Sequence, residues 1–285
     1  MKDATHPTRR ESGPIAADGT IDQRWGDYTA AEHARWDALL ARMTKLLPGR
    51  ASRSYLDAVD RVALSEGGIP DMERLSDRLM DLTGWRVVPV AGLVPDEVFF
   101  DHLANHRFPS GTFIRTAEEF DYIEEPDIFH DIFGHVPLLA DPTYAAFMQA
   151  YGEGGARAIQ AGALPMLARL YWYTIEFGLI VEEGDLRLFG AGIMSSPVET
   201  RFALEDPSPN RLGFDLTRVM QTNYRIDDMQ ESYFVIDSFA DLLAEAHRDF
   251  GPIYEGFANA PTHAPGDILP ADRVLHRGTG AYFNR

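Results

Sequence analysis

The sequence has 285 residues and contains no cysteine. The absence of thiols excludes disulfide bonds, haem or iron–sulfur centres held by thiolates, and catalysis by a thiol nucleophile. A bound metal must therefore be held by histidine, aspartate or glutamate side chains.

Basic residues are scarce. The chain has 26 Lys and Arg residues against 44 Asp and Glu residues, and its formal net charge is −18 at pH 7. Nucleic acids bind to basic surfaces, so a nucleic acid is not an expected partner. The acidity itself bears on solubility and does not indicate a particular function.

Long apolar runs are also missing. No run approaches the roughly 18 residues of a membrane span. The first residues, MKDATHPTRRESGPIAADG, contain no apolar region typical of a signal peptide. We therefore expect a cytoplasmic protein that does not bind membranes.

The composition is that of a globular chain, with 45% hydrophobic and 25% charged residues. The length suits a single large domain. Residues 1–22 are polar and have no periodicity, so we expect a flexible N-terminal arm there. The folded domain is expected over residues 23–285.

Helical periodicity of apolar residues dominates this domain. Thr29 and Glu32 have the spacing of a capping box, which predicts a helix from there to the break at Pro48-Gly49. Further helices are expected over residues 54–65, 71–83, 96–103, 144–152, 164–180 and 237–247. Residues 152–155, GEGG, are expected to break a helix, and 197–212 to form a loop.

Few stretches favour strands. β-Branched residues predict short strands over 85–90 and 112–115. Gly184-Asp185 predicts a hairpin turn, and residues 190–196 a loop in which backbones approach closely. The expected fold class is mainly α with a few short β-strands.

The most informative stretch is residues 124–137, EEPDIFHDIFGHVP, because it contains His130 and His135. On a regular α-helix these two side chains would point about 140° apart and would not converge. Gly134 and Pro137 favour a helix end. We therefore expect His130 on a helix and His135 just past its end. The spacing alone leaves two interpretations open: a pair of metal ligands, or two structural histidines of the core.

A third candidate ligand is Glu176. It lies in the expected helix 164–180, which is apolar on nearly all sides and therefore buried. A carboxylate in such a helix is costly unless it is paired or bound to a cation. The alternative interpretation is that Glu176 lies at one polar edge of the helix. Two imidazoles and one carboxylate are the ligand set of non-haem Fe(II) oxygenases, which keep metal positions open for oxygen and substrate.

The runs EPDIFHDIFGHVPLLADP and WYTIEFGL resemble the pterin-dependent aromatic amino acid hydroxylases, most closely their short bacterial members. The similarity extends from about residue 28 to 239, through TGWRVVPVAGL, FIRT, GAGIMSS and QTNY. It implies a single catalytic domain of that type. It also implies a phenylalanine 4-monooxygenase, which converts L-phenylalanine to L-tyrosine with O₂ and a tetrahydropterin such as tetrahydrobiopterin.

The resemblance also implies roles for individual residues. His130, His135 and Glu176 would bind Fe(II). The pterin would contact Gly92, Leu93, Val94, Phe99 and Asp131, the last of which is glutamate in animal members. The amino acid substrate would contact Arg115, Tyr122, Asp127, Trp172, Gly192 and Ser195, with Arg115 gripping its carboxylate and Asp127 orienting Arg115.

Substrate preference has one indication in the sequence. Tyrosine hydroxylases tend to carry an aspartate two residues after the tyrosine of the NY pair, where this chain has Ile226. An apolar residue at a buried position would suit phenylalanine, because a buried charge would need a partner.

Two other functions fit a His₂Glu site. A zinc hydrolase could use the same ligands, although no HExxH motif is present. A sensor of pterin or amino acid could hold a structural metal. Animal relatives also carry a regulatory domain and a tetramerising helix, for which this chain has no room, so a monomer is expected.

Overall fold

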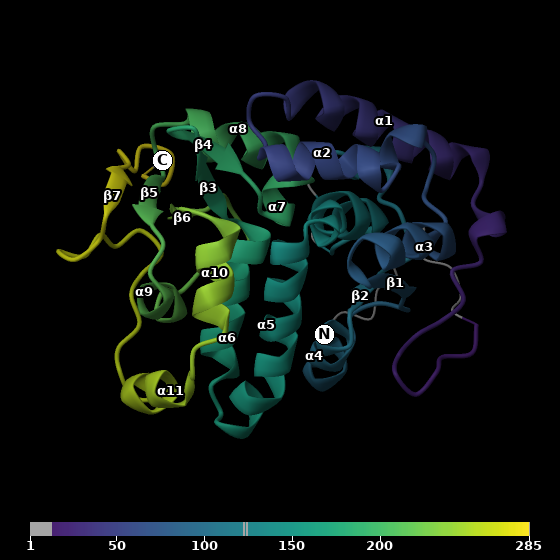
Figure 1. The fold of residues 1–285 in the computed structure, drawn as a ribbon. Helices are drawn as coiled ribbons and strands as arrows, with labels where there is room; N and C mark the ends of the chain where they lie inside the picture. Colours follow the sequence, from purple (N-terminus) through teal and green to yellow (C-terminus); the bar gives the residue numbers. More distant parts are fainter. Residues whose placement is uncertain (1–12, 122, 124, 285) are drawn as a thin grey trace.

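The structure, a computed structural model, describes residues 13–121, 123 and 125–284 (Figure 1). Its α-helices are α1 (Ala30–Leu46), α2 (Arg53–Arg61), α3 (Met72–Thr83), α4 (Asp96–Ala104), α5 (Pro142–Gln160), α6 (Leu164–Tyr171), α7 (Ala191–Met194), α8 (Pro197–Glu205), α9 (Leu216–Met220), α10 (Phe239–Ala246) and α11 (Gly251–Phe257). Two π-helices, Phe129–His135 and Trp172–Glu176, interrupt this pattern. Short 3₁₀ turns lie at Trp25–Asp27, Leu64–Glu66, Ala117–Glu119 and Pro137–Ala140.

The strands are short and form two sheets. Strands β1 (Arg86–Pro89) and β2 (Arg107–Ser110) pair in parallel. The larger sheet has the order β4-β3-β6-β5-β7, from strands β3 (Leu179–Glu182), β4 (Asp185–Leu188), β5 (Asn210–Gly213), β6 (Ser232–Ile236) and β7 (Val274–His276). The expected mainly α fold class with a few short strands is confirmed.

Several elements form as their local sequence predicts. Thr29 and Glu32 make the capping box of α1, whose apolar face is buried in the core. Helix α3 ends at Gly84, which adopts the left-handed conformation (φ 79°) that glycine tolerates best. Strands β3 and β4 form the predicted antiparallel hairpin.

Helix α5 corrects one prediction, because it runs without a break through residues 152–155. Gly152 and Gly155 serve packing against α4. A Cβ on Gly152 would lie 2.4 Å from the backbone nitrogen of Ala104, and one on Gly155 would lie 2.0 Å from the ring of Phe100. The absence of side chains at these positions therefore lets α4 lie directly on α5.

Other predicted boundaries were also wrong. The helix expected over 164–180 ends in the π-helix at Glu176, and β3 begins at Leu179. The strand expected over 112–115 is absent there, since β2 comes earlier, at Arg107–Ser110. The loops expected over 190–212 contain α7, α8 and β5, because Ser196 caps α8 and Pro197 occupies its first turn.

The N-terminal segment differs from the expected arm. Residues 1–12 lie outside the described part of the chain. The N–H of Ile21 donates to the carbonyl of Pro89, Thr20 forms a bridge with Val90, and the ring of buried His102 bonds to the carbonyl of Asp18. Residues 18–21 are thus attached to β1 and α4, beside the domain expected over residues 23–285.

Helix α5 lies at the centre of the arrangement (Figure 1). It packs against α4 on one side and α10 on the other. The N-terminal helices α1 to α3 cover one end of the molecule, and the larger sheet lies toward the C-terminus. Every helix in the described part of the chain is too short or too polar to cross a bilayer.

Candidate metal centre

His130 and His135 both lie within the π-helix Phe129–His135. The expectation that His135 follows the end of a helix is therefore wrong. A π-helix bonds residue i to residue i+5, so side chains five positions apart lie on adjacent turns of one face. This geometry replaces the α-helical separation of about 140° and allows both rings to face the same point.

Glu176 is the last residue of the second π-helix, Trp172–Glu176. The i→i+5 pattern is explicit here, since the N–H of Phe177 donates to the carbonyl of Trp172 at 2.8 Å. The chain turns into β3 directly afterwards. Glu176 therefore leaves the end of the helix toward the two histidines and is not at a polar helix edge.

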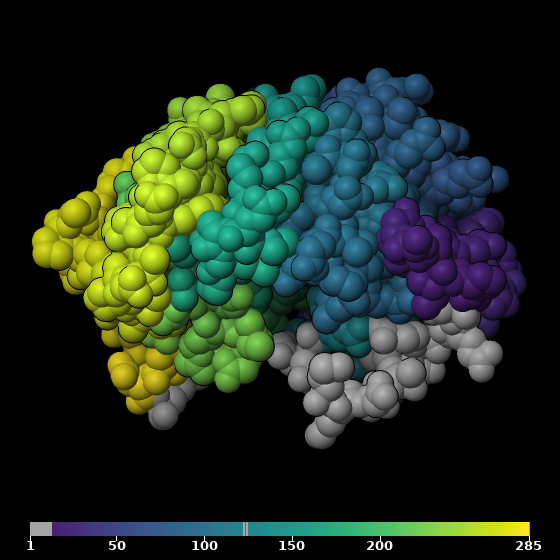
Figure 2. Space-filling model, turned by 90° about the horizontal axis from the view of Figure 1, so that it is seen from below, coloured from purple at the N-terminus to yellow at the C-terminus, as the bar shows by residue number. Residues whose placement is uncertain are grey.

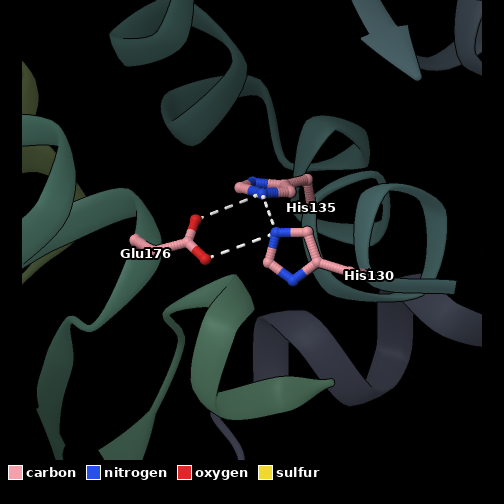
Figure 3. Close-up of side chains that lie close together, drawn as sticks. All are labelled: His130, His135 and Glu176. Carbon is pink, nitrogen blue, oxygen red and sulfur yellow. Dashed lines mark hydrogen bonds and ion pairs between the residues drawn. The ribbon is translucent and has the colours of Figure 1, made fainter. Parts of the chain in front are cut away.

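The three side chains converge (Figure 3). The Nε2 atoms of His130 and His135 are 3.2 Å apart, and each lies 3.3 Å from one carboxylate oxygen of Glu176. Nitrogen and oxygen donors within 4.8 Å of one another can share one metal ion. The sequence therefore identified three residues that the fold brings together.

The surroundings favour the ligand form of these groups. Burial lowers the pKa of His130 to about 4, so its imidazole is neutral at pH 7. Burial raises the pKa of Glu176, but the two adjacent imidazoles outweigh this and leave the pKa below its usual value. Two imidazole rings and one carboxylate suit a divalent transition metal.

The ring of His130 is oriented by Ser195, which follows α7. The Ser195 hydroxyl lies 2.9 Å from Nδ1 of His130. Helix α7 can approach this closely because Gly134 has no side chain. A Cβ at this position would lie only 2.9 Å from the carbonyl oxygen of Ala191. His135 is held differently, because its ring packs on that of Phe108, with the ring centroids 5.0 Å apart. Its Nδ1 has no hydrogen-bond partner among the described residues.

The donors open into a cavity of about 750 Å³. Its walls are mainly aromatic and apolar, and include Phe99, Phe100, Phe108, Phe113, Tyr151, Tyr171, Trp172 and Tyr224. Figure 2 shows the surface hollowed between the green segment near residue 220 and the blue segments. A cavity with apolar walls and a few convergent polar groups has the character of a small-molecule site.

All residues expected to contact a pterin line this cavity: Gly92, Leu93, Val94, Phe99 and Asp131. Leu93 stands at the rim and is 88% exposed. Asp131 accepts a hydrogen bond from the N–H of Gly111 at 2.7 Å, and burial raises its pKa to about 7. Asp131 can therefore act as donor or acceptor near neutral pH.

The residues expected to contact the amino acid are distributed differently. Trp172 lines the cavity, whereas Arg115, Asp127, Gly192 and Ser195 are buried and are not among the residues that line it. Asp127 holds Arg115 through Nε at 2.9 Å and Nη2 at 2.7 Å, so the expected orienting pair exists. Tyr122 lies outside the described residues.

Gly190 confirms the close backbone approach predicted for residues 190–196, because a Cβ there would lie 2.5 Å from the carbonyl oxygen of Glu176. A Cβ on Gly192 would lie 2.8 Å from Oε1 of Glu176. Any larger residue would push against the carboxylate that faces the histidines.

Sequence reasoning missed Gln230. Its side-chain oxygen accepts the indole N–H of Trp172 at 2.8 Å, and its amide donates to the carbonyl of Arg225. The Trp172 ring also stacks on Tyr224, with centroids 4.3 Å apart. The pairing of positions 172 and 230 depends on tertiary folding, so no local pattern could have indicated it.

The argument drawn from Ile226 is wrong in its physical premise. Ile226 is 73% exposed and does not line the cavity. A charge at this position would remain in water, so burial cannot explain a preference for phenylalanine.

The chain was compared with known proteins. Residues 18–253 match the family model of biopterin-dependent aromatic amino acid hydroxylases. Phenylalanine-4-hydroxylase of Caulobacter vibrioides is 58% identical over 93% of this chain and 90% of the relative, and that of Ralstonia nicotianae is 53% identical over 93% and 85%. The crystal structure of the phenylalanine hydroxylase of Chromobacterium violaceum with iron and phenylalanine is 50% identical, with a TM-score of 0.88 over 91% of this chain and 95% of that one. This chain belongs to the family of biopterin-dependent aromatic amino acid hydroxylases.

Proposed function

We propose that this protein is a phenylalanine 4-monooxygenase, which converts L-phenylalanine to L-tyrosine with O₂ and a tetrahydropterin. The observation that carries the proposal is the convergence of His130, His135 and Glu176 at an aromatic-lined cavity. Relatives more than 50% identical over nearly the whole chain support the choice of phenylalanine as substrate.

The donor set fits Fe(II). The three side chains are 13%, 4% and 12% exposed, so they are largely shielded from solvent and face the cavity that they line. Their arrangement leaves one side open toward that cavity, as an oxygenase requires. When bound, iron and the reduced pterin together supply the electrons and the activation of O₂ that hydroxylation of an aromatic ring needs.

The protein's own contribution is binding and orientation. Phe99 offers an aromatic face, and the backbone of residues 92–94 offers polar groups, to a flat bicyclic pterin. Asp131 can bond to the pterin's ring nitrogens. Trp172, fixed by Gln230 and Tyr224, would hold the substrate ring beside the metal donors.

Arg115 would bind the carboxylate of phenylalanine. Because Asp127 takes the Nε and Nη2 edge of its guanidinium, the substrate would meet the edge that carries Nη1. Gly192 and Ser195 would act indirectly, by giving room to Glu176 and by orienting His130. Tyr122 is also proposed as a substrate contact.

We further propose that the enzyme acts as a cytoplasmic monomer. We also propose that its catalytic domain spans residues 23–285, with residues 18–21 attached to it. The net charge of −18 argues against nucleic acid as a partner.

The test is tyrosine formation by purified protein loaded anaerobically with Fe(II), then given air, tetrahydropterin and phenylalanine. Tyrosine should form only when every component is present. Glu176→Gln should abolish it, whereas Glu153→Gln, on the exposed face of α5, should not. Pterin oxidation without tyrosine would remove phenylalanine as the substrate, and tryptophan and tyrosine would be tried next. No pterin consumption with any metal would favour a hydrolase or a sensor.

A further inference from the structure

The π-helix that carries both histidines ends against Pro137. In an α-turn, the carbonyl of Phe133 would accept the N–H of the residue four positions later, which is Pro137. Proline has no N–H, so this donor does not exist. A buried carbonyl without a donor is costly, and the structure supplies one from another element.

That donor is the hydroxyl of Tyr55, in helix α2. It donates a hydrogen bond to the carbonyl oxygen of Phe133. The two rings also pack edge to face, with centroids 6.0 Å apart. Tyr55 is separated from Phe133 by 78 positions in sequence, and it does not line the cavity.

Tyr55 is itself held rigidly. Its side chain is fully buried. The buried hydroxyl of Ser52 caps α2 by accepting the N–H of Tyr55, and the N–H of Ser52 donates to Leu188 in β4 at 2.8 Å. Burial raises the pKa of Tyr55 well above its usual value, so the hydroxyl keeps its proton. The scaffold therefore presents a fixed donor to the Phe133 carbonyl.

We propose that Tyr55 is a positioning residue of the metal centre. Its hydroxyl supplies the donor that Pro137 cannot, and so fixes the orientation of the Phe133 peptide, which lies between His130 and His135, in the π-helical register in which both rings face one point. In an α-helical register the two rings would point about 140° apart and could not share a metal. This inference rests on the proposed function, because it assumes that the convergent donors bind a metal ion.

The test compares Tyr55→Phe with Tyr28→Phe in the full chain. Both changes remove the hydroxyl of a buried tyrosine that donates to a main-chain carbonyl, and Tyr28 bonds to Thr112, outside the π-helices. Co²⁺ serves as the probe. Its dissociation constant is measured by competition with a chelator, and its visible absorption spectrum reports ligand geometry. Thermal unfolding of the metal-free proteins measures the general loss of stability.

Tyr55→Phe should bind Co²⁺ about tenfold more weakly, corresponding to about 1.4 kcal/mol, with an altered spectrum. Tyr28→Phe should lose stability but keep the wild-type affinity and spectrum. Wild-type affinity in Tyr55→Phe, or equal weakening in both variants, would overturn the proposal. Failure of the wild-type protein itself to bind Co²⁺ would instead count against the proposed function.

A double variant separates folding from positioning. Tyr55→Phe with Pro137→Ala restores an N–H that can satisfy the Phe133 carbonyl through an α-turn. It should fold at least as well as Tyr55→Phe alone but still bind Co²⁺ weakly. Recovery of wild-type affinity would show that any donor suffices, which contradicts a role in the register.

Discussion

The Ser195 hydroxyl oxygen lies 2.9 Å from Nδ1 of His130 and 2.8 Å from the carbonyl oxygen of Ala191. The hydroxyl gives its single proton to the carbonyl, so it must accept the proton of Nδ1. The ring of His130 is thereby held in the tautomer whose Nε2 lone pair faces His135 and Glu176. A hydrogen bond at the ring nitrogen that does not face the metal sets both the orientation and the basicity of a metal-binding histidine.

Ser195→Ala should therefore weaken binding of Fe(II) by about tenfold or more, because His130 loses its fixed tautomer. Affinity is measured by competition with a chelator. Ser196→Ala is the matched control: this side chain caps α8, so its loss should lower the free energy of unfolding by about 1 kcal/mol and leave metal affinity unchanged. Unchanged affinity in Ser195→Ala would contradict the assignment.

Only part of the ligand set could be predicted from burial and charge, because a carboxylate such as Glu176 in an apolar segment needs a partner or a cation. The spacing of His130 and His135 left metal ligands and core histidines as alternatives, and the family resemblance supplied the assignment. The local geometry could not be predicted in the same way. Gly134 and Pro137 indicated a helix end, but π-helical registers depend on tertiary contacts such as the one from Tyr55.

The fold shows a similar limit. Caps and turns at Thr29, Gly84 and Gly184 were predictable, because each depends on a few neighbouring residues. The glycines of α5 were misread as a helix break, because their role lies in contact with α4, which local sequence does not reveal.

Gly155→Ala should destabilise the protein by about 1–3 kcal/mol or more, because the new Cβ would overlap the ring of Phe100. Gly154→Ala, one position earlier in the same helix, should stabilise it by about 0.5–1 kcal/mol, since the nearest atom to that Cβ is 4.0 Å away. Chemical denaturation of both variants measures the difference. Equal effects would show that α4 does not depend on this close approach.

Gln230→Leu should reduce kcat/KM for phenylalanine by about tenfold, because the indole N–H of Trp172 loses its acceptor and the ring its fixed orientation. The change should fall mainly on KM. Gln230→Glu keeps an acceptor and should restore much of the loss. Gln149→Leu, in which the lost bond joins Gln149 to Glu153 on the surface, should have no effect. Steady-state kinetics measure kcat and KM for each variant. An unaltered KM in Gln230→Leu would contradict the role of the contact between Gln230 and Trp172.

Glu199 predicts a dependence of stability on pH. Burial raises its pKa to about 7, only partly offset by hydrogen bonds from the Tyr233 hydroxyl and the backbone of Gln230, while Asp228 raises it further. The folded protein thus holds a proton that the unfolded chain releases at lower pH. Between about pH 4.5 and 7, the contribution of Glu199 to stability falls as the pH rises, and this loss is complete above the folded pKa.

Glu199→Gln should remove this loss. Its free energy of unfolding should exceed that of the wild type at pH 8 by up to about 3 kcal/mol and match it near pH 4.5. Denaturation across this pH range measures the effect. Glu97→Gln, on the exposed face of α4, should leave the pH profile unchanged. A difference in stability between Glu199→Gln and the wild type that does not grow with pH over this window would contradict the raised pKa.

The central claim is that His130, His135 and Glu176 hold the iron with which this protein hydroxylates phenylalanine. The most direct measurement is the amount of tyrosine formed per tetrahydropterin oxidised, in the wild type and in Glu176→Gln, with iron content determined for both. The account predicts close to one tyrosine per pterin in the wild type, and neither stable iron nor tyrosine in the variant. Tyrosine formation by Glu176→Gln, or oxidation of pterin by the iron-loaded wild type without tyrosine, would contradict it.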